Sequence, residues 1–486
     1  MAVIELVAMK RWLLPLLMLA ACGQAEDQGP IRVSAIGGPP TLVDPNRTQA
    51  DLPQRVLLGA VAETLVAYDA AGQITPALAQ RWVITSDGLS AIFRLRRAAW
   101  TNGKQVTSEE VARWARAIIA PNSRNPLRDA FDSIEEINPT TPEVIEFRLT
   151  TPRPPLLQLL AEPEASILSR ALLTSGPYQV ARRTGATAVL TPRDRPAQGE
   201  RALPTIRLTG ERAAKAIARF LSRDTDLVLG GTYRDWPIVQ AAQPQDRTIR
   251  LDPAEGLFGL SFQRTDGFFA DPLNRQVLGM VIDRDAILNA FNAPGWAGAL
   301  TVLPQRYRSA ADPAFPPWAV YELAGRIDEA RRRLGAWRAS HPEPVRVRLY
   351  LPEGPGSTLL YGRLAADWRQ LGIETVRTNA READLRIVDQ VAPAGSALWY
   401  LTTLACPTGD ACSEETVAAL DRARDAQSLV ERGTQLAMAD RALANSGLYI
   451  PLTRPLRWSL VAQRLSGFRE NPRAWHPLTA LIRRQR

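Results

Sequence analysis

Two cysteines late in the chain have the spacing for covalent chemistry. Cys406 and Cys412 are six positions apart, and Pro407, Gly409 and Asp410 between them favour a turn that brings the sulfur atoms together in an oxidising compartment. The spacing is not C-x-x-C and no histidine is near, which argues against a redox or metal site. We therefore predict a disulfide, to which loop-closure entropy assigns about 2.4 kcal/mol.

Motifs of the common enzyme classes are absent from the sequence. It contains no G-x-S-x-G, no H-E-x-x-H, no phosphate-binding glycine loop and no G-x-G-x-x-G between a strand and a helix. The only histidines, His341 and His476, each stand beside a proline, and isolated histidines are more often structural than metal ligands. We expect a protein that is not an enzyme, with no catalytic residue, metal site or cofactor; an unrecognised hydrolase is a minor alternative.

The N-terminal residues indicate export. A basic pair at 10–11 precedes a short apolar run at 12–18, and residues 19–22 (LAAC) resemble a bacterial lipobox. The run is too short to span a bilayer, so it predicts a processed export signal. The lipobox implies cleavage before Cys22 and lipidation of its thiol, which would hold the protein in the periplasm of a Gram-negative cell by acyl chains alone. An acidic residue upstream, unusual in such a signal, favours translation from Met9.

Length and composition limit the possible architectures. A chain of 486 residues exceeds the usual size of one compact core, so two or three lobes are expected. The composition, 45% hydrophobic and 22% charged, is that of a globular protein. The net charge of +9 comes almost entirely from dispersed arginines without interleaved aromatic residues, so we expect no nucleic-acid partner.

Residues 75–118 indicate the elements that would position a site. Turn signals lie at 86–88 and 102–103, and between them apolar residues recur at the period of two expected for a half-buried strand: Ala91, Phe93 and Leu95. A helix follows, with Thr107 or Ser108 as its N-cap and two acids in its first turn. The segment predicts strand, turn, strand, turn and helix.

These motifs also resemble a known family. Their order, P-A-L-A-x-x-W, D-G-L, F-x-L-R and N-G-K-x-V-T-x-E-E-V, is similar to the signature segment of extracellular solute-binding family 5, the binding proteins of peptide-type ABC importers. Residues 56–68 resemble a family helix. Within 256–291, FFADPLNRQVLGMVIDRDAILNAF resembles another family segment, in which Asp271 caps a helix and we interpret Asp283 and Arg284 as a structural pair at that helix's end.

The resemblance implies an α/β fold, the two-lobed periplasmic binding protein type II, with mixed central sheets and a small extra subdomain in the first lobe. We expect the chain to divide as follows: 1–22 lipoprotein signal peptide, 23–30 tether, 31–253 first lobe including the subdomain around 55–170, 254–448 second lobe, and 449–486 return crossover with a tail packing on the first lobe.

In peptide-binding relatives an aspartate after a second-lobe strand pairs with the amino terminus of the peptide. An ungapped comparison places Pro393 at that position, and proline offers no charge. Asp389, four residues earlier, could replace it only if the loop is rebuilt. The candidate ligand contacts are Gln263, Arg264, Asp389, Gln390, Trp399 and Tyr400.

The function implied by the resemblance is the substrate-binding component of an ABC importer. Such a protein, expected to be a monomer, captures a peptide or similar small solute between two lobes and delivers it to a permease and ATPase complex, with a lipid anchor as its only membrane contact. The alternative is a ligand-sensing or scaffold lipoprotein that kept the fold and lost transport.

Overall fold

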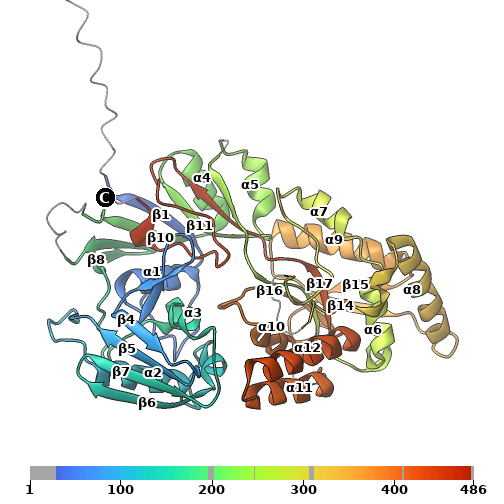
Figure 1. Cartoon of the computed structure of the whole chain (residues 1–486). Coiled ribbons are helices and arrows are strands. Elements are labelled where there is room, and N and C mark those ends of the chain that lie inside the picture. Colours follow the sequence, from blue (N-terminus) through green and yellow to red (C-terminus); the bar gives the residue numbers. More distant parts are fainter. Residues whose placement is uncertain (1–28, 195–201, 246, 306–310, 408–409, 483–486) are drawn as a thin grey trace, which may run out of the picture.

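Two lobes lie side by side and are joined near the middle of the molecule (Figure 1). The structure, a computed structural model, describes residues 29–194, 202–245, 247–305, 311–407 and 410–482. The predicted export signal, Cys22 and most of the tether lie outside these residues. Within the described ranges, no helix combines the length and the hydropathy needed to cross a membrane.

The main sheet of the first lobe is mixed, with strand order β12-β18-β11-β1-β10-β9-β8. Its strands are β1 (Ile31–Ile36), β8 (Tyr178–Thr184), β9 (Thr187–Pro192), β10 (Ile206–Glu211), β11 (Leu227–Thr232), β12 (Ile249–Asp252) and β18 (Arg457–Val461), flanked by helices α1 (Leu52–Val61), α4 (Ala213–Leu221) and α5 (Trp236–Ala242). Only β1 pairs in parallel, with β10 and β11. Leu465, Leu478 and Leu481 of the C-terminal segment join the apolar core beneath this sheet. The end of the chain therefore completes the first lobe.

A small subdomain extends the first lobe. It contains the sheet β4-β5-β7-β6, covered by α2 (Ser108–Ile119). The strands are β4 (Ala79–Ile84), β5 (Ser90–Leu95), β6 (Ile134–Thr141) and β7 (Val144–Leu149); a hairpin of β2 (Val66–Tyr68) and β3 (Ile74–Pro76) and the helix α3 (Leu156–Leu160) lie beside them. Burial alternates along β5, and the rings of Phe93 and Phe147 meet edge to face at 5.6 Å. Thr107 caps α2 in a capping box with Glu110. The elements predicted for 75–118 are confirmed.

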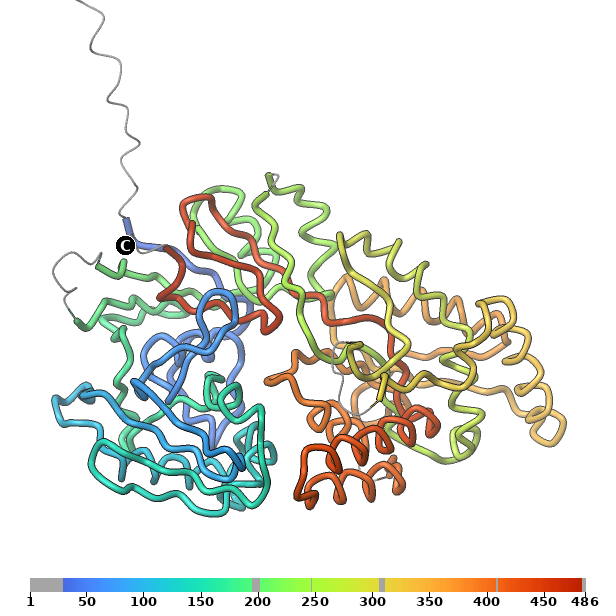
Figure 2. Tube along the Cα trace, in the orientation of Figure 1, coloured from blue at the N-terminus to red at the C-terminus, as the bar shows by residue number. Residues whose placement is uncertain are grey.

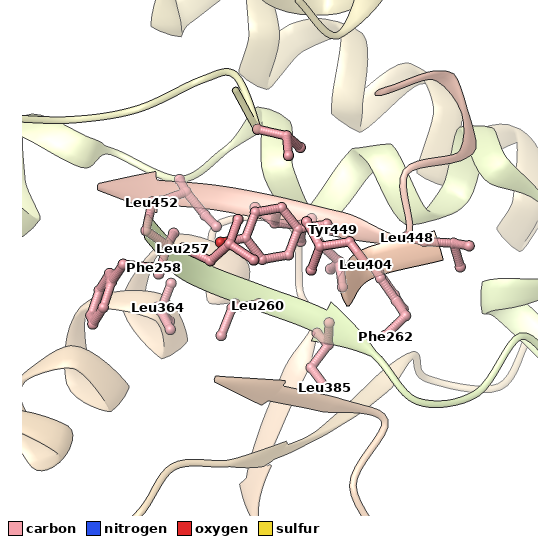
Figure 3. Close-up of a cluster of buried hydrophobic side chains, with 14 of the residues drawn as sticks. Leu257, Phe258, Leu260, Phe262, Leu364, Leu385, Leu404, Leu448, Tyr449 and Leu452 are labelled. Atoms are coloured by element: carbon pink, nitrogen blue, oxygen red, sulfur yellow. The ribbon is translucent and has the colours of Figure 1, made fainter. Parts of the chain in front are cut away.

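The second lobe contains a five-stranded sheet of order β15-β14-β16-β13-β17. The strands are β13 (Gly256–Phe262), β14 (Arg346–Tyr350), β15 (Glu374–Arg377), β16 (Leu385–Val391) and β17 (Tyr449–Thr453); the helices are α6 (Pro272–Met280), α7 (Arg284–Phe291), α8 (Leu323–Arg338), α9 (Pro355–Arg369), α10 (Ala397–Ala405), α11 (Glu414–Asp425) and α12 (Leu429–Ser446). Every residue of β13 is buried, and its apolar side chains pack with those of β17 and the helices (Figure 3). Each such side chain contributes about 1.5–3 kcal/mol.

Two local predictions were wrong. The expected helix at 56–68 begins earlier, after the capping residue Asp51, and ends at Val61, because residues 66–68 form β2 instead.

Asp283 and Arg284 do not pair at the end of one helix. Asp283 is the N-cap of a second helix, α7, and accepts from the Ala286 backbone N–H at 2.9 Å. Arg284 instead points into the core, where it contacts backbone carbonyls.

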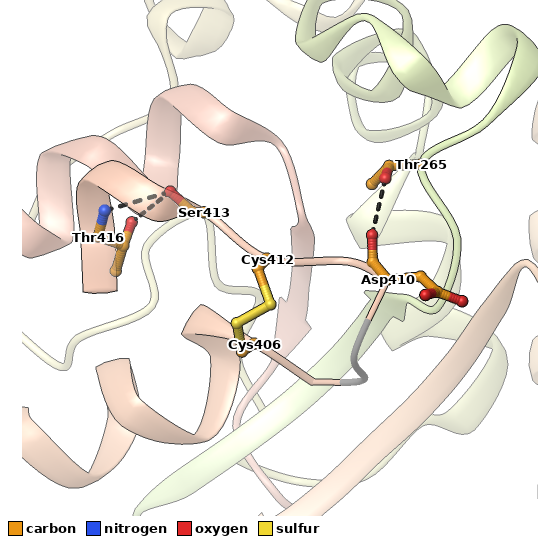
Figure 4. Close-up of a disulfide and its surroundings, with 6 residues drawn as sticks. All are labelled: Thr265, Cys406, Asp410, Cys412, Ser413 and Thr416. Atoms are coloured by element: carbon orange, nitrogen blue, oxygen red, sulfur yellow. Dashed lines mark hydrogen bonds between the residues drawn. A yellow bond between two sulfur atoms is a disulfide. The ribbon is translucent and has the colours of Figure 1, made fainter. Parts of the chain in front are cut away.

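The predicted disulfide is confirmed. The Cys406–Cys412 bond connects the end of α10 to the residue before the N-cap of α11, with Cα atoms 4.2 Å apart (Figure 4). Ser413 then caps α11 by accepting from the Thr416 backbone N–H. The Asp410 carbonyl accepts from the Thr265 hydroxyl at 2.9 Å, which ties the same segment to the loop after β13.

Candidate functional site

The chain crosses between the lobes twice, after β12 and after β17 (Figure 2). Gly256, the first residue of the second-lobe sheet, has φ of +155°, and a Cβ there would lie 1.9 Å from the Gln390 carbonyl oxygen. Only glycine allows this approach. The first crossover is therefore packed directly against the end of β16, and the side chains on that end of β16 lie at the junction of the lobes.

Asp389 on β16 forms an ion pair across this junction. Its Oδ1 lies 2.7 Å from Nη1 of Arg457, the first residue of β18 in the first lobe, and both side chains are 15% exposed. Arg457 Nη2 also donates to the Asp389 carbonyl at 3.3 Å. The carboxylate that could have replaced the missing amine anchor is therefore already engaged by a residue of the second crossover.

The loop after β16 docks on the first lobe. We call residues 392–396 the latch loop. The Gly395 backbone N–H donates to Gln158 Oε1 at 2.7 Å, and the Tyr68 hydroxyl donates to the Pro393 carbonyl at 3.4 Å. Arg473 Nη1 donates to the Ala392 carbonyl at 2.9 Å. Ala394 is 1% exposed and belongs to the apolar core of the small subdomain. In this arrangement the latch loop of the second lobe holds the two lobes together.

A buried acidic pair supports the first-lobe side of this contact. Glu162 and Glu164 share Arg55, whose Nη2 lies 3.4 Å from Glu162 Oε2 and whose Nε lies 2.5 Å from Glu164 Oε1. Burial, reinforced by the Glu164 charge, raises the pKa of Glu162 to about 8 despite Arg55 and Arg473. Burial, together with Glu162, also raises the pKa of the Tyr68 hydroxyl. A group that titrates near neutral pH therefore lies directly behind the latch loop.

The six candidate contacts from the sequence are not brought together. Gly256 is opposite Val391 and Phe262 is opposite Leu385, so Gln263 and Arg264 follow the end of β13 that points away from the other lobe. Gln263 Nε2 donates to the Ser261 carbonyl at 3.1 Å, and Arg264 pairs with Asp266 at 2.7 Å.

The other four candidates lie nearer the junction. Asp389 and the exposed Gln390 are on β16, which extends to Val391. Trp399 and Tyr400 begin α10, with ring centroids 4.9 Å apart. Trp399 is half-buried, and Tyr400 is 0% exposed within the second-lobe core.

Sequence reasoning missed Tyr68, Gln158, Arg457 and Arg473, which provide the first-lobe side of the junction. No local motif marks them, because they come from four separate segments that only the tertiary structure brings together. Two cavities of about 740 and 670 Å³ are lined by the first lobe and its C-terminal segment alone, so neither lies between the lobes.

Comparison with known proteins places this geometry in context. The family profile described as bacterial extracellular solute-binding proteins, family 5 Middle, matches residues 73–396. The probable deoxycholate-binding periplasmic protein YgiS of Escherichia coli (strain K12) is 35% identical over 90 residues, which are 18% of this chain and 16% of that protein. The chain thus aligns with about a sixth of the length of this relative.

Two solved structures share the fold. The murein tripeptide binding protein MppA of Escherichia coli matches with a TM-score of 0.80 at 17% identity, covering 93% of this chain and 98% of that chain. Haemophilus influenzae OppA in complex with RPPGFSPFR matches with a TM-score of 0.78 at 16% identity, covering 93% of this chain and 98% of that chain. The fold is that of the two-lobed type II periplasmic binding proteins.

Proposed function

Because the chain belongs to the bacterial extracellular solute-binding proteins of family 5, we propose that it captures a small solute between its lobes for the permease and ATPase of an ABC importer. The observation that carries the proposal is the latch loop, through which the second lobe contacts the first at Gln158 and Tyr68. A solute that bridges the lobes favours the closed state, since it binds that state better than the open one.

The solute class that we propose is a peptide or a similar small solute. MppA is described as a murein tripeptide binding protein, OppA was solved with a peptide, and YgiS is described as probably deoxycholate-binding. Of the candidate contacts, Gln390 and Trp399 lie on the elements that flank the latch loop, and we propose these two first. Catalysis is not part of the proposal, because the family binds substrates for transport.

The closure mechanism predicts that a bound solute compacts the protein. The solute that co-purifies from periplasm would be identified by mass spectrometry, removed by reversible unfolding and added back during small-angle X-ray scattering. We expect the radius of gyration to fall at saturation.

Gln158→Ala removes the acceptor shared by Gly395 and Arg473, so solute affinity should fall about tenfold.

Gln427→Ala, at an exposed position of the second lobe, is the matched control and should bind as the wild type does. A solute that binds tightly without any compaction would contradict the proposal and favour a ligand-sensing or scaffold protein.

We further propose that the mature protein is a monomer that begins at a lipidated Cys22 and is anchored in the periplasm by its acyl chains. Mass spectrometry of the intact protein from membranes should give the mass of residues 22–486 plus acyl groups. Cys22→Ala should remove the acyl mass and also block cleavage, so the variant should keep its signal residues. A wild-type protein whose N-terminus carries no acyl mass would contradict the anchor.

A further inference from the structure

Three arginines converge at a second contact between the lobes, and we call them the arginine cluster: Arg153, Arg424 and Arg432. Arg153 precedes α3 in the first lobe, whereas Arg424 and Arg432 belong to α11 and α12 of the second. Arg432 Nη1 donates to the Pro152 carbonyl at 2.8 Å. Arg424 Nε lies 3.7 Å from Asp132 Oδ2, and Arg153 contacts the other oxygen of the same carboxylate.

The cluster is continuous with the latch loop. The segment 152–158 contacts the second lobe at both ends, through the Pro152 carbonyl at one end and Gln158 Oε1 at the other. A solute between α3 and the second lobe would therefore lie within reach of both contacts. This places the arginines at the junction of the lobes rather than on an outer surface.

The cluster carries more positive charge than its neighbours neutralise. Arg424 also pairs with Asp421 on its own helix, Nη1 to Oδ1 at 2.6 Å. Arg432 is 7% exposed and forms no ion pair with any residue that the structure describes. Among the described ion pairs, Asp132 is the one carboxylate that joins Arg153 to a second-lobe arginine, and its side chain is 36% exposed. A buried guanidinium without an anionic partner destabilises the folded state.

The electrostatic effect is visible on Arg153. Its Nε donates to the Ser133 hydroxyl at 2.9 Å, and its side chain is 4% exposed. Burial, followed by the charges of Arg432 and Arg424, lowers the pKa of Arg153 to about 10. Bringing α11 and α12 against the first lobe thus moves positive charges together, a repulsion that the Asp132 carboxylate and the Pro152 carbonyl offset only in part.

An anion at this position would reverse that effect. It would interact with guanidiniums from both lobes when the lobes meet, but with only one side when they separate, so it would bind the closed state better. Guanidiniums present paired N–H donors that match the oxygens of a carboxylate.

We propose that the arginine cluster recognises a carboxylate, or a comparable oxyanion, on the solute that this protein carries, and that this contact drives closure of the lobes. The inference rests on the proposed function and narrows it to anionic solutes.

The test uses the full chain and simple probes. Sulfate would be titrated at millimolar concentration against chloride of equal ionic strength, and acetate against its neutral analogue acetamide, while thermal unfolding and scattering are measured. We expect sulfate to raise the Tm of the wild type saturably, by about 1–2 °C at ten times its Kd, and to compact the protein. Acetate should act in the same direction and acetamide should not.

Arg432→Gln and Arg424→Gln should each abolish the saturable response, while Arg441→Gln, an exposed residue on the same helix as Arg432, should retain it. Circular dichroism checks that each variant is folded. A wild type without a saturable sulfate response, or variants that retain it, overturns the inference. The proposed function would survive that result if the co-purified solute still compacts the protein. If a neutral solute compacts Arg432→Gln as well as it compacts the wild type, the inference is overturned and the proposed function stands.

Discussion

Replacing Arg284 with methionine is expected to lower the free energy of unfolding of the second lobe by about 3–5 kcal/mol. Arg284 is 8% exposed, and its Nε and Nη2 donate to the Pro451 carbonyl at 3.0 and 2.7 Å. It also donates to the carbonyls of Ala299, Ile282 and Gly279 at 3.0 to 3.4 Å. Methionine fills most of the volume but leaves these carbonyls without donors, and each unsatisfied group is unfavourable by about 1–3 kcal/mol.

The environment of Arg284 sets the size of the loss. Burial, followed by the charge of Arg326, lowers the pKa of Arg284 to about 9, and this desolvation offsets part of the stability that the hydrogen bonds contribute. Urea unfolding can be followed by tryptophan fluorescence, because the Trp318 ring lies 5.8 Å from the guanidinium. Arg331→Met, exposed on α8, is the control and should change stability by less than about 0.5 kcal/mol. Equal urea midpoints for the two variants would show that the carbonyl contacts contribute nothing.

The second large effect concerns the pH dependence of stability. The pKa of Glu162 is raised to about 8 in the folded protein, above the value near 4.5 expected when unfolded. Between these values the folded state binds one more proton than the unfolded state. The stabilisation of the folded state by protonated Glu162 is therefore fully present below about pH 4.5 and is lost as pH rises toward 8. The expected loss is about 1 kcal/mol per pH unit.

Glu162→Gln should remove this dependence, because glutamine is neutral at every pH. Arg55 keeps its ion pair with Glu164, whose Oε1 lies 2.5 Å from Arg55 Nε, so the variant does not leave that guanidinium unpaired. Relative to the wild type, the free energy of unfolding of the variant should rise by about 1 kcal/mol for each pH unit between pH 6 and 8, measured by urea unfolding at each pH. Burial also raises the pKa values of Asp367 and Asp440, but only to about 6, so the slope above pH 6.5 is attributed to Glu162.

Glu343→Gln, at an exposed position, should leave the pH profile parallel to that of the wild type. Parallel profiles for Glu162→Gln and the wild type would mean that Glu162 is ionised in the folded protein at neutral pH. Because Glu162 lies behind Tyr68 and Arg473, solute affinity measured over the same range would report whether its ionisation also affects the latch loop.

Elements whose signals are local were predictable from the sequence. Helix α2 begins after Thr107 because that side chain and Glu110 cap each other three residues apart, and β5 alternates because one of its faces is buried in the apolar core of the small subdomain. The predictions failed where tertiary contacts decide the structure. Residues 66–68, expected to continue a helix, instead form β2, because β3 offers them backbone partners.

The sequence by itself determined that this chain has the elements, turns and caps of family 5 and that Pro393 lacks a charge, because those features depend on residues a few positions apart. Only the tertiary structure decided which residues the loop after β16 contacts. It pairs Asp389 with Arg457, 68 positions away, and docks Gly395 on Gln158, 237 positions away. It also brings Arg153 beside Arg432. Such contacts depend on strand order and on the way the two lobes meet, which no local pattern specifies, so residues far apart in the sequence form the junction of the lobes.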